Sequence, residues 1–403
     1  MYDVAVVGAG PAGATAARFL SKSGLEVALV EKEELPRYKP CGGALSEHHL
    51  KRFRYLDGKS DEIGGCPSYG VKIYSDSLDS AGYTYSEPQL LMVLRDEFDK
   101  VLVDLALDYG AELKHNKVKD VNVTPDAAKL ILDDGHVIES RVVVGADGVN
   151  SIVARRSGLN FGWNKWQVAI CAVDEIYVGE SIIEEYSGSQ RPLHIFMLDD
   201  LFGYGWLFSK KEHLNIGIGG LSSKTRNIAG IFVRFVRLLK EMKLVPKDLH
   251  EGKFRAHLVP VSGVIKKAYA DRVVLSGDAA GSPSPLNGEG VYYAMASGQI
   301  ASMTILKALE KGDATSAGLS YYQKELMEDF GYDHELALSL QRQAFYTWPL
   351  MEHAVKLAKS DERLLRISID YGLGKISSDQ FLLESGLRLP VSTLMSAIRG
   401  LIG

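Results

Sequence analysis

Residues 2–31 read YDVAVVGAGPAGATAARFLSKSGLEVALVE, and this stretch decides the fold. The apolar, β-branched run at 2–7 is typical of a buried parallel strand. It leads into a G-x-G-x-x-G turn at Gly8, Gly10 and Gly13. Small helix-forming residues follow, then a second apolar run at 27–30 and the acid Glu31. This order and spacing predicts a strand–turn–helix–strand unit that binds a dinucleotide.

Each residue of the motif has a physical role. Gly8 permits the tight turn, Gly10 lets the backbone approach a pyrophosphate, and Gly13 lets helix and strand pack closely. The helix N-terminus offers N–H groups and a partial positive charge to the phosphates. Glu31 lies where a carboxylate can accept hydrogen bonds from both ribose hydroxyls. A purely structural turn is the alternative, and the motif alone does not decide between NAD and FAD.

Composition limits the classes of function. The 403 residues are 46% hydrophobic and 24% charged, which allows a large core and more than one domain. A net charge of −5 provides no basic field for nucleic acid. The three cysteines are too few and too scattered for a disulfide framework or a thiolate metal site. The sequence shows neither a signal peptide nor an apolar run of bilayer length, so we expect a cytoplasmic protein with no metal site.

Two further segments favour a flavin fold. Residues 142–151 (VVVGADGVNS) and 272–280 (RVVLSGDAA) each indicate a buried strand that ends in a Gly–Asp turn. Such turns are common in α/β sheets, but both segments follow the first motif in a fixed order. In this order the sequence resembles the glutathione-reductase-type FAD enzymes, and specifically the branch that contains p-hydroxybenzoate hydroxylase and geranylgeranyl reductase.

The resemblance implies how FAD is held. It assigns Asp147 to a second dinucleotide motif and places Asp278 against the ribityl chain. The stretch PLNGEGV at 285–291 corresponds to the loop and helix start whose backbone amides face the isoalloxazine and pyrophosphate. Gly288 and Gly290 would permit close approach of the backbone there.

Two more positions complete the cofactor site by resemblance. Arg95 matches an arginine near the flavin phosphates and ribityl chain, with a solvated helix-start arginine as the alternative. Val118 matches a position whose backbone meets the adenine. The predicted cofactor-binding residues are Gly8, Gly10, Ala12, Gly13, Glu31, Lys32, Cys41, Gly42, Gly43, Ala44, Arg95, Val118, Asp147, Asp278, Gly288, Gly290 and Val291.

Two stretches point to one member of the branch. Residues 36–46 (PRYKPCGGALS) resemble the P-x-K-P-C-G-G-A loop of geranylgeranyl reductases, which passes beside the flavin ring. Residues 203–210 (GYGWLFSK) are similar to the family's Y-x-W-x-F-P segment, with Ser209 where proline is usual. Strand alternation puts Tyr204, Trp206 and Phe208 on one face, which predicts a wall that binds an apolar chain. An aromatic core stripe is the alternative.

The resemblance implies FAD-dependent reduction of isolated C=C bonds in the geranylgeranyl chains of isoprenoid lipids, by hydride from N5 plus a proton. Cys41 and Tyr204 are the candidate proton donors, although Cys41 could simply be a small residue beside the ring.

There is no second complete G-x-G-x-x-G unit, so electrons would come from transient NAD(P)H or from a ferredoxin-type protein. The alternatives are an aromatic hydroxylase that uses O₂ and NADPH, and an electron-transfer flavoprotein without its own substrate. A flavin halogenase is disfavoured, since no W-x-W-x-I-P segment occurs.

The expected class is α/β, a Rossmann-like fold with an inserted antiparallel-sheet substrate domain and C-terminal helices. We predict a discontinuous FAD domain at 1–66, 90–160 and 264–310, a substrate domain at 67–89 and 161–263, and a helical region at 311–403. After Pro390, one helix face would carry Val391, Leu394, Met395, Ile398, Leu401 and Ile402. This face would pack on the protein's own body or make peripheral contact with the cytoplasmic membrane face, where the lipid is.

Overall fold

The computed structural model describes residues 1–346, 355, 356 and 358–386, and its backbone divides into two compact units. The predicted apolar helix face after Pro390 lies outside the described residues. The first unit consists of Met1–Tyr38, Asp96–Asn164 and Val259–Glu335, and the second of Lys39–Arg95, Lys165–Leu258 and Leu336–Gly403.

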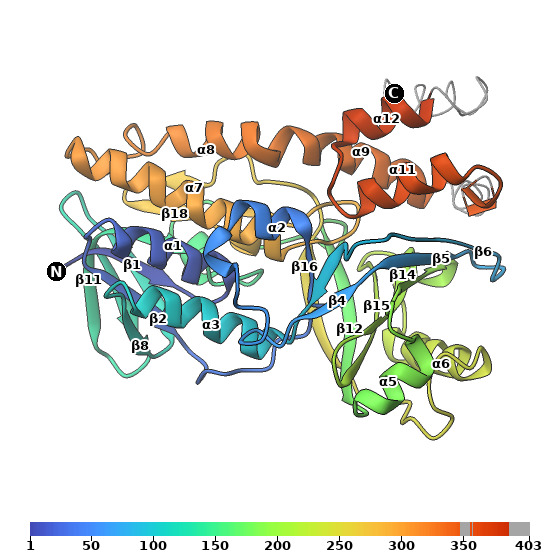
Figure 1. The fold of residues 1–403 in the computed structure, drawn as a ribbon. Helices are drawn as coiled ribbons and strands as arrows, with labels where there is room; N and C mark the ends of the chain where they lie inside the picture. The colour runs from blue at the N-terminus through green and yellow to red at the C-terminus, as the bar shows by residue number, and fades with distance from the viewer. Residues whose placement is uncertain (347–354, 357, 387–403) are drawn as a thin grey trace. The chain divides into compact units, whose positions relative to one another are not determined.

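The first unit is built on a mostly parallel sheet (Figure 1). Its main path runs β17-β18-β11-β1-β2-β8, and β9 and β10 extend it from β11 as an antiparallel meander. The strands are β1 (Tyr2–Val7), β2 (Val27–Glu31), β8 (Glu112–His115), β9 (Val118–Val123), β10 (Ala128–Leu132), β11 (Val137–Gly145), β17 (Tyr269–Ala270) and β18 (Val273–Leu275). β1 lies between β11 and β2, parallel to both, and its last four residues are buried because both faces are covered. The predicted strand–turn–helix–strand unit is therefore confirmed.

Helices pack closely in the first unit. α1 (Pro11–Lys22) lies against α7 (Val291–Glu310), and a Cβ on Gly298 of α7 would come within 2.3 Å of the Ala12 carbonyl oxygen. α8 (Tyr321–Leu326) is fixed by Tyr322, whose buried hydroxyl donates to the Leu275 carbonyl at 2.6 Å. The remaining helices are α3 (Arg95–Leu107), α4 (Ile152–Arg156) and α9 (Tyr332–Tyr346), the last of which continues into the second unit.

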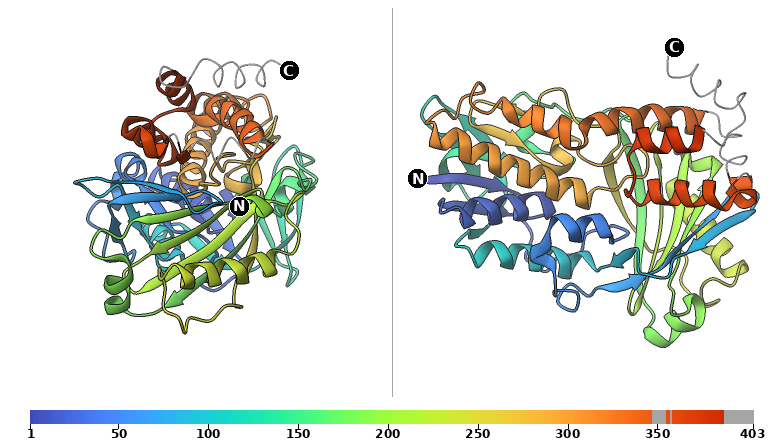
Figure 2. Two further views of the ribbon diagram at one scale, coloured as in Figure 1. Left: turned by 90° about the vertical axis from the view of Figure 1, so that its right-hand side faces the viewer. Right: turned by 45° about the horizontal axis from the view of Figure 1, so that its top comes forward.

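The second unit contains a seven-stranded sheet with the order β16-β12-β15-β14-β13-β5-β6 (Figure 2). Its strands are β5 (Gly70–Tyr74), β6 (Ser80–Thr84), β12 (Val168–Tyr177), β13 (Leu193–Leu198), β14 (Gly203–Ser209), β15 (His213–Leu221) and β16 (Arg255–Pro260). The sheet differs from the antiparallel expectation where β5 pairs with β13, since these two strands run parallel. A parallel pair needs a long connection, and here the chain between β5 and β13 runs through β6, through the segment Asp96–Asn164 of the first unit and through β12.

Each face of this sheet has its own apolar layer. On one face α6 (Ile228–Glu241) packs on alternate residues such as Phe196, Leu207 and Ile216. On the other, α11 (Glu362–Gly372) packs in the cluster that contains Trp206 and Phe208. The unit also holds a small sheet of β3 (Ala44–Ser46), β7 (Leu90–Met92) and β4 (Cys66–Ser68), with α2 (Glu47–Arg52), α5 (Glu180–Ser187) and α12 (Ser378–Gly386). The predicted class, α/β with a Rossmann-like domain, a second sheet and C-terminal helices, is confirmed.

The units are bounded differently from the predicted domains. Residues 39–66 and 90–95 were expected in the FAD domain, but both belong to the second unit, where β3 and β4 pair with β7. Residues 311–335 were expected in a separate helical region, but α8 packs on α7 in the first unit. The assignment of a substrate-binding role to the second unit stays a prediction.

Three buried histidines make the fold sensitive to acid. Burial lowers the pKa of His49 to about 3, of His194 to about 4 and of His334 to about 3, from an ordinary value of 6.5. Below pH 6.5 the unfolded chain binds protons at these sites that the folded chain does not, so stability falls as pH decreases. We expect the three histidines together to lower the free energy of unfolding by on the order of a few kcal/mol between pH 7 and pH 5, partly offset by Glu289, whose pKa burial raises to about 8.

Urea unfolding at the two pH values measures this loss. His334→Leu is the matched variant, because neither ring nitrogen of His334 has a hydrogen-bond partner among the described residues and its neighbours are the rings of Tyr293 and Phe330. The variant should keep wild-type stability at pH 7 and lose less of it at pH 5. An unchanged pH dependence would contradict this account of His334.

Candidate functional site

The glycine turn of the first unit has the geometry that the motif predicts. Gly8 has φ +98°, and a Cβ there would lie 2.4 Å from the Ala146 carbonyl oxygen. A Cβ on Gly13 would lie 1.8 Å from the Gly8 carbonyl oxygen. A Cβ on Gly10 would meet only Arg37, at 3.7 Å. Gly8 and Gly13 are therefore required by the protein's own packing, whereas the backbone at Gly10 is open to a ligand.

The start of α1 suits an anion. Pro11 is the first helical residue, and no side chain among the described residues caps the helix at Gly10. The N–H groups of the first turn lack partners within the helix, and the helix dipole places partial positive charge there. A pyrophosphate would satisfy both.

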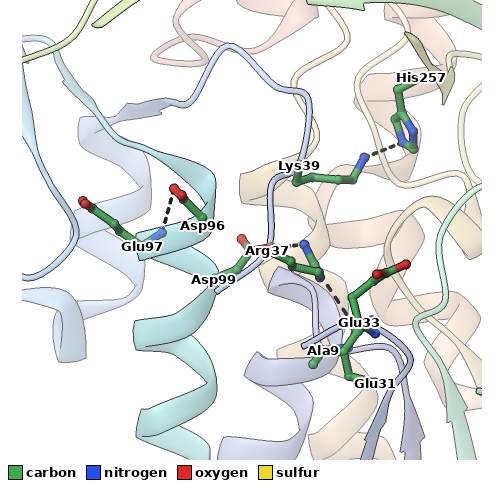
Figure 3. Close-up of polar contacts among 9 residues, drawn as sticks. All are labelled: Ala9, Glu31, Glu33, Arg37, Lys39, Asp96, Glu97, Asp99 and His257. Carbon is green, nitrogen blue, oxygen red and sulfur yellow. Dashed lines mark hydrogen bonds and ion pairs between the residues drawn. The ribbon is translucent and has the colours of Figure 1, made fainter. Parts of the chain in front are cut away.

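The Glu31 carboxylate is held in place at the end of β2 (Figure 3). Its Oε2 accepts a hydrogen bond from the Ala9 N–H at 2.8 Å, and its Oε1 accepts one from the Glu33 N–H at 3.1 Å. A carboxylate has about four lone-pair sites, so acceptor capacity remains for ribose hydroxyls. These residues fit an adenosine ribose. Lys32 is exposed, and its contact with the cofactor stays a prediction.

Arg37 is a site residue that the sequence reasoning missed. Its guanidinium donates to Asp99 Oδ2 of α3 at 3.1 Å and lies 3.8 Å from Glu31 Oε2 (Figure 3). Asp99 is completely buried, so it fixes a cation beside the glycine turn. A guanidinium has five donors and is the usual partner of phosphate. That preference is the signal that could have identified Arg37, which lies within the stretch at 36–46.

The other predicted residues of the first unit lie at turns and element ends. The Asp147 carboxylate accepts hydrogen bonds from Ser151 Oγ at 2.5 Å and the Ile152 N–H at 2.7 Å, so it caps α4, and burial raises its pKa. Asp278 lies half-buried in the short helical turn Gly277–Ala280. Val118 is the buried first residue of β9. Their contacts with the cofactor stay predictions.

The loop before α7 is closed on itself. Gly288 has φ +70° and its N–H donates to the Ser284 carbonyl at 3.0 Å, while the Ser284 N–H donates to the Glu289 carbonyl at 2.8 Å. Gly290 is the N-cap of α7 and Val291 its first residue. Burial raises the pKa of Glu289 to about 8. The structure thus presents a preformed glycine loop at the start of a long helix, as the sequence predicted.

In the second unit, the two stretches that resemble geranylgeranyl reductases lie against each other. A Cβ on Gly42 would lie 2.8 Å from Phe208 Cε2. Gly43 has φ +73°, and a Cβ there would lie 2.2 Å from the Val93 carbonyl oxygen. Cys41 is half-buried, and Ala44 begins β3. Gly42 is therefore required for the loop to pack on the aromatic strand, and Gly43 for it to pack against Val93. Arg95, predicted near the flavin, is the buried first residue of α3.

The predicted aromatic wall is present on β14. The ring centroids of Tyr204 and Trp206 are 5.7 Å apart, and those of Trp206 and Phe208 are 6.1 Å apart. The Trp206 indole lies over the glycines of β15, because a Cβ on Gly217 would come within 2.1 Å of Trp206 Cζ2. Ser209, which replaces the family proline, ends β14 and hydrogen-bonds Ser187 through its hydroxyl. Substrate contact at the wall stays a prediction.

A buried polar group behind this loop was also missed. Glu175 accepts hydrogen bonds from Lys210 and from Asn215, and Asn215 also donates to the Cys41 carbonyl. The signal was the occurrence of Glu175 and Asn215 inside β12 and β15, with Lys210 directly after β14. Lys39 Nζ, in the same loop, lies 2.5 Å from His257 Nε2 of β16 (Figure 3).

Known proteins match this chain along most of its length. A family model described as an FAD binding domain matches residues 1–197. A digeranylgeranylglycerophospholipid reductase of Methanothrix thermoacetophila is 32% identical over 85% of this chain and 87% of its own length. A second protein of that name, from Methanopyrus kandleri, is 30% identical over 85% of this chain and 86% of its own.

Solved structures share the fold. A geranylgeranyl bacteriochlorophyll reductase-like protein from Thermoplasma acidophilum superimposes with a TM-score of 0.79 at 23% identity, over 89% of this chain and 92% of that one. The flavin-dependent halogenase CmlS gives a TM-score of 0.68 at 23% identity, over 86% of this chain and 64% of its own. The shared fold alone therefore does not separate reductases from halogenases. The sequence relatives do, and the chain belongs to the geranylgeranyl reductase family of FAD-dependent oxidoreductases.

Proposed function

We propose that this protein reduces isolated C=C bonds in the geranylgeranyl chains of isoprenoid lipids. The observation that carries the proposal is the contact between the Cys41–Gly43 loop and the aromatic wall on β14. In the family, that loop is the one that passes beside the flavin ring. The named activity of the relatives supports the same substrate class.

Different residues of the chain would bind the cofactor and the substrate. When bound, FAD supplies the hydride, from N5 of its reduced form. The glycine turn, Glu31 and Arg37 would bind its adenosine and pyrophosphate. Tyr204, Trp206 and Phe208 would hold the apolar chain and exclude water. We assign the second dinucleotide motif, the Gly288–Gly290 loop and Arg95 to the remainder of the cofactor, as the resemblance implies.

A proton donor is required because an unconjugated alkene accepts hydride poorly. We propose Cys41 for this role, since its thiol lies on the loop beside the wall, and Tyr204 as the second candidate. Cys41→Ala and Tyr204→Phe each remove one acidic proton with little change of shape. The variant that lacks the donor should keep its FAD and lose roughly 10²- to 10⁴-fold in kcat. If neither loses activity, the proton comes from another group or from water.

The activity is testable under anaerobic conditions. Protein reduced with dithionite should be reoxidised by a digeranylgeranyl glycerophospholipid, and mass spectrometry should find two hydrogens added per reduced bond. Reoxidation that needs O₂ and an aromatic acid would favour the hydroxylase. Reoxidation only by a quinone or a protein would favour the electron carrier. Folded protein that takes up no flavin would contradict all three.

The electron donor and the membrane contact are further proposals. We propose that NAD(P)H or a reduced ferredoxin-type protein reloads the flavin, because electrons must enter and the sequence contains no second complete G-x-G-x-x-G unit. No helix in the described part of the chain is both long and apolar enough to cross a bilayer. A lipid substrate nevertheless requires access to a membrane surface, which favours peripheral contact. Co-sedimentation with vesicles of isoprenoid lipids tests it.

A further inference from the structure

We propose that Glu175, Lys210 and Asn215 form a positioning network that sets the conformation of the Cys41–Gly43 loop and of the Trp206 indole. Through those two groups it would align the alkene for reduction. The catalytic consequence rests on the proposed function, whereas the effect on the loop does not.

Asn215 is the centre of the network. Its Nδ2 donates to the Cys41 carbonyl at 2.9 Å and to Glu175 Oε2 at 2.8 Å. Its Oδ1 accepts from Trp206 Nε1 at 2.7 Å. The residue is completely buried. A primary amide has two N–H donors and one carbonyl acceptor, so one side chain ties the loop backbone and the wall to the same carboxylate. No aliphatic side chain could do this.

The ion pair lies directly behind the loop. Lys210 Nζ donates to Glu175 Oε2 at 2.5 Å, and the lysine side chain is only 2% exposed. A Cβ on Gly43 would lie 2.9 Å from Lys210 Nζ, so the loop backbone packs on the ammonium group. A side chain at position 43 would therefore clash with both the Val93 carbonyl oxygen and Lys210 Nζ.

Stability alone does not explain such a pair. Burying two charges costs more than burying apolar residues of the same volume, and a buried ion pair is weak evidence for a stability role. Glu175 Oε1 is buried and makes no hydrogen bond to any residue that the structure describes, so the pair is not even fully satisfied. The occurrence of the Glu175–Lys210 ion pair is better explained by its fixing the conformation of the Cys41–Gly43 loop.

Strand register places the network in the apolar face that carries the wall. Glu175 of β12 and Phe208 of β14 both pair with Asn215 of β15. Residues directly opposite one another in neighbouring strands project to the same face. The polar side chains of the network therefore interrupt the apolar layer beside the Cys41–Gly43 loop. In that position their hydrogen bonds can fix the loop against the aromatic wall.

Alkylation of Cys41 measures the loop directly. Cys41, Cys66 and Cys171 fall in three different tryptic peptides, so iodoacetamide labelling of each can be followed by mass spectrometry. We expect Asn215→Leu to label Cys41 about tenfold faster than wild type, with Cys66 unchanged and FAD content retained. With the lipid, the kcat of this variant should fall about tenfold or more while KM changes little. A displaced loop or indole misaligns the alkene and slows the chemical step more than it weakens lipid binding.

Two comparisons control for simple destabilisation. Asn122→Leu makes the same change at an exposed position of β9 and should label at the wild-type rate. Lys210→Met leaves the Glu175 carboxylate buried and unpaired, whereas Lys210→Met with Glu175→Gln leaves no charge. The double variant should therefore recover part of the labelling protection and of the kcat. If Lys210→Met does not fold, Asn215→Leu decides.

The outcomes separate the two proposals. Wild-type labelling of Cys41 in Asn215→Leu and Lys210→Met would overturn the network, whatever the protein reduces. Faster labelling together with a wild-type protein that reduces no geranylgeranyl lipid would support the network and contradict the proposed function.

Discussion

Gly13→Ala is expected to yield protein that purifies without FAD and takes none up on reconstitution. The added methyl would lie 1.8 Å from the Gly8 carbonyl oxygen and 3.1 Å from Val6 Cγ1. Neither atom is the end of a flexible side chain, so α1 must move away from β1. The turn that would receive the pyrophosphate is then lost. Overpacking of this kind costs about 1–3 kcal/mol of stability.

Flavin absorbance after reconstitution, with urea unfolding of the same samples, measures both effects. Gly10→Ala is the informative companion, because its Cβ would meet only Arg37, at 3.7 Å. The protein should fold with wild-type stability yet bind FAD more weakly, since the methyl occupies space that the ligand needs. Gly252→Ala, whose Cβ would meet nothing within 4 Å, should match wild type in both measurements. Normal FAD content in Gly13→Ala would contradict this role of the turn.

The sequence predicted the structure best where that structure depends on residues close together in the chain. The strand, turn, helix and second strand at 2–31 form β1, α1 and β2, because turn chemistry and apolar periodicity act within a few residues. Strand alternation likewise predicted that Trp206 and Phe208 share a face. The aromatic cluster also shows why that pattern was ambiguous: residues of α11 cover the same layer, so the wall is part of a core as well.

Contacts between distant segments could not be predicted. Arg37 and Asp99 are 62 residues apart, and nothing local to either indicates the pair. The Asn215 network depends on the mutual register of β12, β14 and β15, and a slip of one residue would turn each side chain to the other face. Residues 39–66 were assigned by the expected position of their loop near the flavin. They group with the second unit instead, together with β7, the strand with which β3 and β4 pair.

The pairing of Trp206 with Gly217 should produce strongly non-additive mutations. Gly217→Ala places a methyl 2.1 Å from Trp206 Cζ2. The indole is buried and hydrogen-bonded to Asn215, so it cannot move away without losing packing and that hydrogen bond. We expect Gly217→Ala to lose about 1–3 kcal/mol of stability by overpacking. Trp206→Ala alone should lose about 3–5 kcal/mol through the cavity it leaves. Both should lose lipid reduction and keep FAD, because the wall and not the glycine turn is damaged.

In the double variant the methyl introduced at position 217 would enter the space that the indole has left. Its stability should therefore equal or exceed that of Trp206→Ala, whereas independent effects would add. Urea unfolding of the four proteins gives the coupling energy, and FAD content is the control that the first unit is intact. Additive losses would mean that the indole does not lie over β15. In that case the surface beside Cys41 is not a flat aromatic wall, and the alkene would have no fixed plane on which to lie.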